Sequence, residues 1–197
     1  MLIVFEGIDK SGKTTQAKKA VSFIRKHKKK VSFYKYPNKK GLLGDILSKF
    51  LKEKIDLSPT AQFLLFIADM AMDQEKIFKD LSSGKVVVCD RYFLSTLAYQ
   101  RFPYEKGVEI IKRINFLRPD LIIYLDISPE TAMKRQNKIK KSKERYEKNV
   151  ERLLLARTKY RAMAEENLFG KWIVIDGNKS EEEVTSEVLK NIENLLR

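Results

Sequence analysis

The stretch from Gly7 to Thr14 constrains the fold of this chain more than any other. Its sequence is Gly-Ile-Asp-Lys-Ser-Gly-Lys-Thr, and it lies between the apolar run 2–6 and a helical pattern over 14–27. A buried strand, a G-x-x-x-x-G-K-T motif and a helix, in that order, are what a phosphate-binding P-loop requires. The alternative is a glycine-containing turn that carries Lys-Thr by chance. It is disfavoured because strand, motif and helix all agree.

The residue types in this motif suit a polyphosphate. Gly7 and Gly12 let successive backbone N–H groups surround a phosphate, and the following helix directs its positive dipole end at the same anion. Lys13 adds a charge for the β- and γ-phosphates, and the Thr14 hydroxyl is a ligand for Mg²⁺. We therefore predict a site for ATP and Mg²⁺. Its predicted nucleotide-contacting residues are Gly7, Lys10, Ser11, Gly12, Lys13, Thr14 and Thr15.

Strand and helix patterns alternate along the rest of the chain. Besides 2–6, the expected strands are 31–36, 85–89, 121–126 and 172–176. The expected helices are 14–27, 42–53, 58–81, 94–100, 105–117, one starting at 128, 146–168 and one starting at 180. This alternation predicts an α/β P-loop fold, a five-stranded parallel sheet with helices on both faces. Because the 197 residues contain no repeat or linker, we expect one domain over 1–197.

The formal net charge of +14 raises the question of nucleic-acid binding. The cations are spread along the chain rather than gathered in one arm or repeat. An enzyme that binds nucleotides also gains from attracting phosphates. A solvated surface that attracts nucleotides is therefore favoured over a nucleic-acid interface.

Two features bear on the cellular environment. The sequence has no apolar window of about 18 residues, so we expect no membrane span. The single cysteine, Cys89, allows no internal disulfide, which fits a reducing cytoplasm. Because Cys89 ends an apolar run, we interpret it as a small buried hydrophobic residue rather than a reactive thiol.

The third expected strand delivers Asp90 and Arg91 to its carboxyl end. In P-loop proteins an acid at this place helps to hold Mg²⁺ or its water ligands. An arginine beside it would be costly to bury unless it served an anion or paired with the acid. A purely structural Asp90–Arg91 pair is the alternative hypothesis.

Two further segments could contact anions. Lys39 and Lys40 follow the second strand, in a loop where open α/β sheets bind ligands, although a solvated lysine is an equal alternative. The segment 135–146 is strongly basic, with Glu144 as the one carboxylate in 135–145. Such a segment could close over ATP as a lid and stabilise charge on the transferred phosphoryl group. An unstructured charged loop is the alternative. The lid cations are Arg135, Lys138, Lys140, Lys141, Lys143 and Arg145.

Several segments along nearly the whole chain match one pattern. They are F-E-G-I-D at 5–9, G-K-T-T-Q at 12–16, L-L-F-I-A-D at 64–69, D-R-Y at 90–92, S-T-L-A-Y-Q at 95–100, P-D-L at 119–121, L-D at 125–126 and E-R-Y-E at 144–147. On these segments the chain resembles the thymidylate kinase family of P-loop enzymes. The resemblance implies transfer of the γ-phosphoryl group of ATP to dTMP with Mg²⁺, and a homodimer. The open alternatives are a kinase of another pyrimidine nucleotide such as dUMP or UMP, and an NTPase stimulated by nucleic acid.

The resemblance also implies roles for individual residues. Asp9 would face the 3′-hydroxyl of the acceptor and a neighbouring arginine, Arg91 would hold the acceptor phosphate, and Tyr99 would disfavour a ribose. Implied acceptor-binding residues are Asp9, Lys39, Phe66, Met70, Arg91, Thr96, Tyr99 and Gln100. Phe66 would stack on the pyrimidine, and Thr96 and Gln100 would lie near its edge. Implied catalytic residues are Lys13, Asp90, Arg91, Arg135 and Arg145, with Thr14 and Asp90 at the metal.

The chain departs from the family pattern at two positions. Met70 stands where the family normally has an arginine that bonds to thymine, and methionine cannot donate a hydrogen bond. We hypothesise that another donor such as Arg101 replaces it, or that base selection is relaxed. Lys10 stands where some relatives have a catalytic arginine in the P-loop. Since the lid is rich in cations, we predict that the lid supplies most of the charge at the transition state.

Overall fold

The computed structural model describes residues 1–138, 144–146 and 149–196. These residues form a five-stranded sheet with the strand order β2-β3-β1-β4-β5, in which every pair is parallel. The strands are β1 (Leu2–Glu6), β2 (Val31–Lys35), β3 (Val86–Asp90), β4 (Leu121–Asp126) and β5 (Trp172–Asp176). The predicted α/β class and parallel five-stranded sheet are confirmed.

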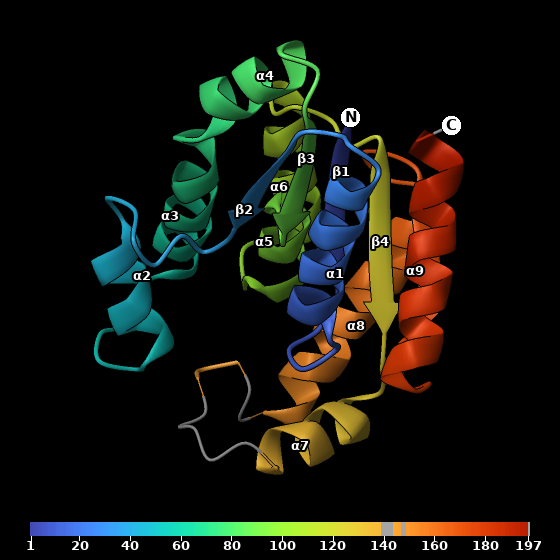
Figure 1. Cartoon of the computed structure of the whole chain (residues 1–197). Coiled ribbons are helices and arrows are strands. Elements are labelled where there is room, and N and C mark those ends of the chain that lie inside the picture. Colours follow the sequence, from blue (N-terminus) through green and yellow to red (C-terminus); the bar gives the residue numbers. More distant parts are fainter. Residues whose placement is uncertain (139–143, 147–148, 197) are drawn as a thin grey trace.

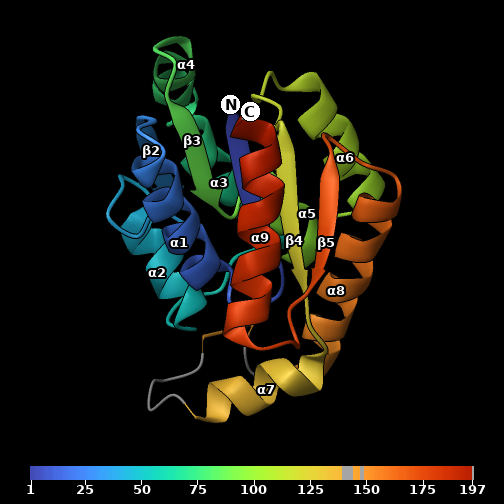
Figure 2. The same ribbon diagram turned by 45° about the vertical axis from the view of Figure 1, so that its right-hand side comes forward.

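Helices cover both faces of this sheet (Figures 1 and 2). The described helices are α1 (Lys13–Lys26), α2 (Gly44–Leu51), α3 (Pro59–Ala71), α4 (Gln74–Ser82), α5 (Phe93–Tyr99), α6 (Tyr104–Arg113), α7 (Pro129–Asn137), α8 (Val150–Glu165) and α9 (Glu181–Leu196). On one face α1 and α9 pack on the sheet, with Ala17 and Val188 in the core beside Phe5. The other face carries α3, α5 and α8, with Phe63 and Tyr160 in its core. Because both faces are covered, β1, β3 and β4 are buried along their whole length.

The carboxyl ends of the parallel strands meet at one edge of the sheet. Phe5 of β1 is in register with Asp90 of β3, and Glu6 is in register with Tyr124 of β4. The chain leaves β1 to build β2 and β3 on one side, and then crosses over to build β4 and β5 on the other. Ligands of open α/β sheets bind at such a reversal of strand order, outside the carboxyl ends. The P-loop, which follows β1, lies at this point.

The structure corrects one long element. We expected a single helix over 58–81, but the chain forms α3 and α4, with a break at Met72 and Asp73. The carbonyl of Met70 accepts a hydrogen bond from the Gln74 side chain at 3.1 Å. The Asp73 carboxylate accepts one from the Tyr36 hydroxyl at 3.0 Å. This partner comes from a distant part of the chain, so helical periodicity could not predict the break.

Other helix ends differ from the expectation by a few residues. The helix expected from 146 begins at Val150, because the Asn149 side chain caps it by accepting from the Arg152 N–H at 3.0 Å. The helix start expected at Ser128-Pro129 is confirmed, with the Ser128 hydroxyl accepting from the Thr131 N–H. The lid positions 139–143, with Lys140, Lys141 and Lys143, lie outside the described residues.

In the described part of the chain, no helix combines the length and the apolar character that crossing a membrane would need. Cys89 is fully buried in β3, as expected for a small hydrophobic residue, and burial raises the pKa of its thiol. His27 lies exposed just after α1.

Asp126, at the carboxyl end of β4, attaches α8 to the sheet. Its carboxylate accepts hydrogen bonds from Arg157 at 2.6 and 3.0 Å and from Arg161 at 2.6 and 3.0 Å. The hydroxyl of Tyr124 donates a further one at 2.9 Å. Burial alone would raise the pKa of Asp126, but the bonds from the two arginines outweigh it and lower the pKa.

We predict that Asp126→Asn lowers the free energy of unfolding by about 1–3 kcal/mol near pH 7, as expected when bonds to a charged group are lost. Because folding lowers this pKa, the stabilisation is complete above the unfolded pKa of about 3.9 and disappears as pH falls through the folded value. Urea unfolding of both proteins from pH 7 to pH 2.5 measures the difference. The matched control is Asp45→Asn, which removes an exposed pair with Lys49 and should cost less than about 1 kcal/mol. A difference for Asp126→Asn that persists unchanged in acid would contradict this account.

Candidate active site

The P-loop backbone has the conformation that its glycines permit. Gly7, Lys10 and Gly12 have positive φ angles of 150°, 66° and 96°. A Cβ atom on Gly7 would lie 2.7 Å from the carbonyl oxygen of Leu125 and 2.6 Å from the Ser11 hydroxyl, so a side chain cannot be accommodated there. The hydroxyl of Ser11 is itself buried, with no hydrogen-bond partner among the described residues. A loop of this shape presents backbone N–H groups to an anion.

Lys13 is the cation at the centre of this loop. Its ammonium donates to the carbonyl of Ile8 at 3.0 Å and lies 3.9 Å from the Asp9 carboxylate. The residue is only 6% exposed. Burial, followed by the positive charge of Arg91, lowers the pKa of Lys13 to about 8. A bound phosphate would supply the negative charge that favours the protonated lysine.

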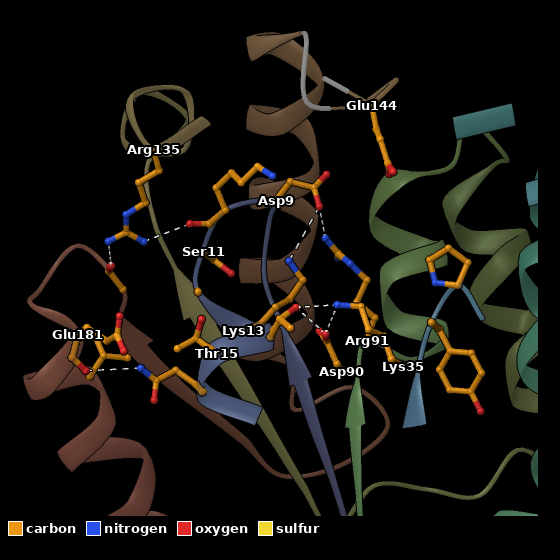
Figure 3. A pocket seen from close by; sticks show the side chains of 18 of the residues that line it. Asp9, Ser11, Lys13, Thr15, Lys35, Asp90, Arg91, Arg135, Glu144 and Glu181 are labelled. Atoms are coloured by element: carbon orange, nitrogen blue, oxygen red, sulfur yellow. Dashed lines mark hydrogen bonds and ion pairs between the residues drawn. The ribbon is translucent and has the colours of Figure 1, made fainter. Parts of the chain in front are cut away.

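A cavity of about 930 Å³ opens over the P-loop (Figure 3). Its wall is formed by the P-loop, the loop after β2, the end of β3 and the loop between β5 and α9. Arg135 of α7 closes one side, where it donates to the carbonyls of Lys10 at 3.1 Å and Gly177 at 2.7 Å. The lining residues are Asp9 to Gln16, Lys35 to Lys40, Asp90, Arg91, Arg135, Glu144, Gly177, Lys179, Glu181 and Val184.

Three side chains form a polar cluster at the floor of this cavity. The Thr14 hydroxyl donates to the Asp90 carboxylate at 2.6 Å, and the Lys35 ammonium contacts both, at 2.9 Å and 2.8 Å. Burial alone would raise the pKa of Asp90, but the charges of Lys13 and Lys35 lower it. The sequence predicts Thr14 and Asp90 at this point, but it does not predict Lys35.

Arg91 and Asp9 form an ion pair beside the P-loop. Arg91 also donates to the carbonyl of Gly7 at 3.1 Å and to Ser95 at 2.9 Å, and its guanidinium lies 5.2 Å from the centre of the Tyr99 ring. Burial alone would raise the pKa of Asp9, but Arg91 lowers it. Asp90 and Arg91 therefore each pair with other residues, rather than with each other as the alternative hypothesis supposed.

Buried Glu6 forms hydrogen bonds with the residues around Arg91 and so helps to hold the Asp9–Arg91 pair in place. Its carboxylate accepts from the Tyr92 N–H at 2.8 Å, from Ser95 at 2.6 Å and from the Tyr160 hydroxyl at 2.8 Å. Burial raises the pKa of Glu6, and Arg91 partly offsets this. Ser95 and Tyr160 are also within 2.8 Å of each other, so the residues that fix Arg91 form one network.

A second pocket adjoins the cavity on the side of α3 and α5. Asp9, Tyr36, Pro37, Arg91 and Glu144 line both spaces, so the two meet at the Asp9–Arg91 pair. The predicted acceptor residues that line the second pocket are Asp9, Phe66, Met70, Arg91, Thr96, Tyr99 and Gln100. The other lining residues, to which the sequence assigned no acceptor contact, are Tyr36, Pro37, Leu51, Asp69, Tyr92, Ser95, Glu144 and Tyr146.

Some predicted residues lie elsewhere than expected. Lys39 lines the large cavity and pairs with Glu144. Arg145 donates to the carbonyls of Phe50 and Ile55, each at 2.9 Å, and is not among the described residues that line either pocket. Arg101 is exposed and is likewise not among those lining residues. The structure thus does not bring Arg145 or Arg101 to the site, and their roles stay predictions.

Known proteins resemble this chain over most of its length. The sequence model of a family described as "Thymidylate kinase" matches residues 5–188. A "Probable thymidylate kinase" of Methanocaldococcus jannaschii is 39% identical, over 99% of this chain and 97% of the relative. A "Thymidylate kinase" of Plasmodium falciparum is 32% identical over 96% and 88%, and one of Leptospira interrogans is 36% identical over 96% and 92%. The chain belongs to the thymidylate kinase family.

Lys35 and Glu6 are two charged residues of this thymidylate kinase family site that the sequence did not single out. Lys35 is the last residue of β2, and Glu6 is the last residue of β1. Both therefore occupy the strand-end position that led us to single out Asp90. The same rule finds Glu6, which ends the expected strand 2–6, but it does not find Lys35, because the expected strand 31–36 runs one residue further than β2.

We predict that Lys35→Met lowers the free energy of unfolding of the ligand-free protein by about 1–3 kcal/mol, because the buried Asp90 carboxylate loses a charged partner. Lys18→Met, which removes an exposed lysine of α1, serves as the control and should change stability by less than about 0.5 kcal/mol. Urea unfolding measures both. Equal unfolding midpoints for the two variants would show that Lys35 does not stabilise Asp90.

Proposed function

We propose that this protein transfers the γ-phosphoryl group of ATP to dTMP, giving ADP and dTDP. The proposal rests on one observation, that two pockets meet at the Asp9–Arg91 pair. One pocket lies beside a P-loop, and the other is lined by aromatic and amide side chains. The family match and the printed names of the relatives support the same reaction.

The reaction is a direct in-line transfer without a covalent intermediate. The acceptor phosphate is already ionised, so a general base is dispensable, and catalysis consists of positioning and charge neutralisation. Lys13 neutralises the β- and γ-phosphates, and Arg91 holds the acceptor phosphate where both pockets meet. Arg135, which lines the ATP cavity, adds a further cation from the start of the lid.

Thr14 and Asp90 fit a magnesium ion by the chemistry of their donors. A hydroxyl and a carboxylate 2.6 Å apart are hard oxygen ligands of the kind that Mg²⁺ takes alongside nucleotide phosphates. The described residues contain no cluster of three or more His, Cys, Asp or Glu side chains suited to a metal, so phosphate oxygens would complete the coordination. When bound, the ion would neutralise charge on the β- and γ-phosphates. The contacts of the Lys35 ammonium with Thr14 and Asp90 support a preference for positive charge at this point.

The second pocket supplies the acceptor contacts. Phe66 of α3 offers an aromatic face for the pyrimidine, and Thr96 and Gln100 offer polar groups at its edge. Tyr99 lies against Arg91 and its hydroxyl accepts from the Asp9 N–H at 2.8 Å, so its ring borders the place of the sugar. Met70 is 2% exposed and contributes only apolar surface.

We also propose that residues 1–197 work as a single domain, that the protein forms a homodimer, and that it is located in the cytoplasm. The dimer is supported by large apolar side chains that stay exposed on α3 and α4, namely Leu64 at 53% and Phe78 at 59%. The cytoplasmic location is supported by the nucleotide substrates and by the single, buried, unpaired Cys89.

The test of the proposed reaction is ADP release from Mg·ATP with dTMP, dUMP, UMP, dCMP, thymidine or single-stranded DNA as the added partner. We predict that dTMP gives the highest kcat/KM, and that Lys13→Ala lowers kcat by at least about 100-fold with a smaller change in KM for dTMP. Release stimulated by DNA alone would replace the kinase proposal with a nucleic-acid-stimulated NTPase. Equal use of dUMP would show that Met70 has relaxed selection at the base.

The homodimer predicts a mass near twice 23.0 kDa by light scattering after gel filtration. Leu64→Asp should shift the protein to the monomer, because a charge would be buried at the contact. Leu154→Asp is the matched control, since Leu154 of α8 is 52% exposed and lies outside the proposed contact. A monomeric wild-type protein would overturn this part of the proposal.

A further inference from the structure

Gln100 lines the acceptor pocket, and the oxygen of its side-chain amide already accepts a hydrogen bond. It is 3% exposed, and its Oε1 accepts a hydrogen bond from the hydroxyl of Tyr146 at 3.0 Å. Its Nε2 group makes no hydrogen bond to any described residue. A glutamine amide can turn over to exchange its donor and acceptor, and the Tyr146 bond favours one of the two orientations.

Tyr146 also lines this pocket, and its neighbours hold it in place. Its ring packs against Phe50 with 6.3 Å between centroids and against Tyr99 with 5.2 Å. The neighbouring Arg145 donates its backbone N–H to the carbonyl of Leu51 at 2.8 Å, and its side chain bonds to the carbonyl of Phe50. Burial raises the pKa of Tyr146 to about 12, so at neutral pH the hydroxyl keeps its proton and can donate.

The two orientations of a glutamine amide suit different bases. At positions 3 and 4, a uracil-type base such as thymine offers an N–H donor and a carbonyl acceptor. Cytosine offers the reverse, a ring-nitrogen acceptor and an amino donor. A glutamine amide therefore pairs with the two kinds of base only by turning over. A phenol hydroxyl donates more strongly than it accepts, so the turned-over amide would lose the better bond to Tyr146.

This orientation matters more here because Met70 cannot donate to the base. Among the described residues, four neutral polar side chains within α5 or directly after it line the pocket, namely Ser95, Thr96, Tyr99 and Gln100. The Ser95 hydroxyl already donates to Glu6, and the Tyr99 hydroxyl already accepts from the Asp9 N–H, which leaves Thr96 and Gln100 for the base. Arg91, the cation of this pocket, is engaged by Asp9 and Ser95. Discrimination between a 4-oxo and a 4-amino pyrimidine thus depends chiefly on which end of the Gln100 amide faces the base.

We propose that Tyr146 is a positioning residue for base selection: its hydroxyl fixes the Gln100 amide with the NH₂ group toward the base, so that the pocket accepts 4-oxo pyrimidine nucleotides and disfavours 4-amino ones. The proposal rests on the proposed function of this same pocket. It gives a role to Tyr146, the last residue of the predicted lid segment 135–146.

The test is the ratio of kcat/KM for dCMP to that for dTMP in Tyr146→Phe, which keeps the ring and removes only the hydroxyl. We expect the ratio to rise about tenfold, which corresponds to about 1.4 kcal/mol. The change should come mainly from KM, with kcat for dTMP nearly unchanged. Gln100→Glu, which can only accept at neutral pH, should shift the ratio further toward dCMP.

Tyr34→Phe is the matched control. It also removes a buried tyrosine hydroxyl bond, to Asp80 at 2.8 Å, but Tyr34 is not among the described residues that line the acceptor pocket. The control should leave the ratio unchanged. An unchanged ratio in Tyr146→Phe, with wild-type protein active on dTMP, would overturn the inference and leave the proposed function intact. Equal losses for both nucleotides would also overturn it, since they would indicate a structural role alone. Wild-type protein inactive on every pyrimidine mononucleotide would overturn both.

Discussion

The ion pair between Asp9 and Arg91 is the interaction on which the rest of the site depends. Arg91 has a positive φ of 73°, a conformation that is costly for a non-glycine residue, and its side chain is only 13% exposed. A guanidinium in such a place is tolerated only when its charge and its donors are satisfied. Asp9, the carbonyl of Gly7 and the Glu6–Ser95–Tyr160 network satisfy it. Arg91 is therefore fixed between the pocket beside the P-loop and the pocket beside α5, where a phosphate shared by two nucleotides would lie.

Two other cations of the site, Lys13 and Lys35, are also paired with carboxylates of the protein. Lys13 lies between the Asp9 carboxylate and the carbonyl of Ile8, and Lys35 lies against Asp90 and Thr14. Lys13, Lys35 and Arg91 are thus each held by a carboxylate of the protein. Bound substrate phosphates and a metal ion would replace these protein partners, while the side chains are already in place. Phosphoryl transfer would then need less reorganisation of the site.

Much of this arrangement follows from local sequence. The positions of Lys13 and Thr14 follow from the G-x-x-x-x-G-K-T spacing after an apolar strand. Asp90 and Arg91 follow from their place at the end of β3, because parallel strands bring their carboxyl ends together. The break between α3 and α4 and the anchoring of Arg145 on α2 depend instead on partners distant in sequence, such as Tyr36 and Phe50. No periodicity within a segment contains that information. The pairing of Tyr146 with Gln100 joins positions 46 residues apart and belongs to the same class.

The central claim is that the two pockets are halves of one site joined at Arg91. Titration calorimetry with an adenosine and a thymidine linked 5′ to 5′ by five phosphates tests it most directly. The account predicts one molecule bound per chain, about 100-fold or more tighter than ATP or dTMP alone, because both halves engage together. Binding no tighter than ATP, or two molecules per chain, would contradict it.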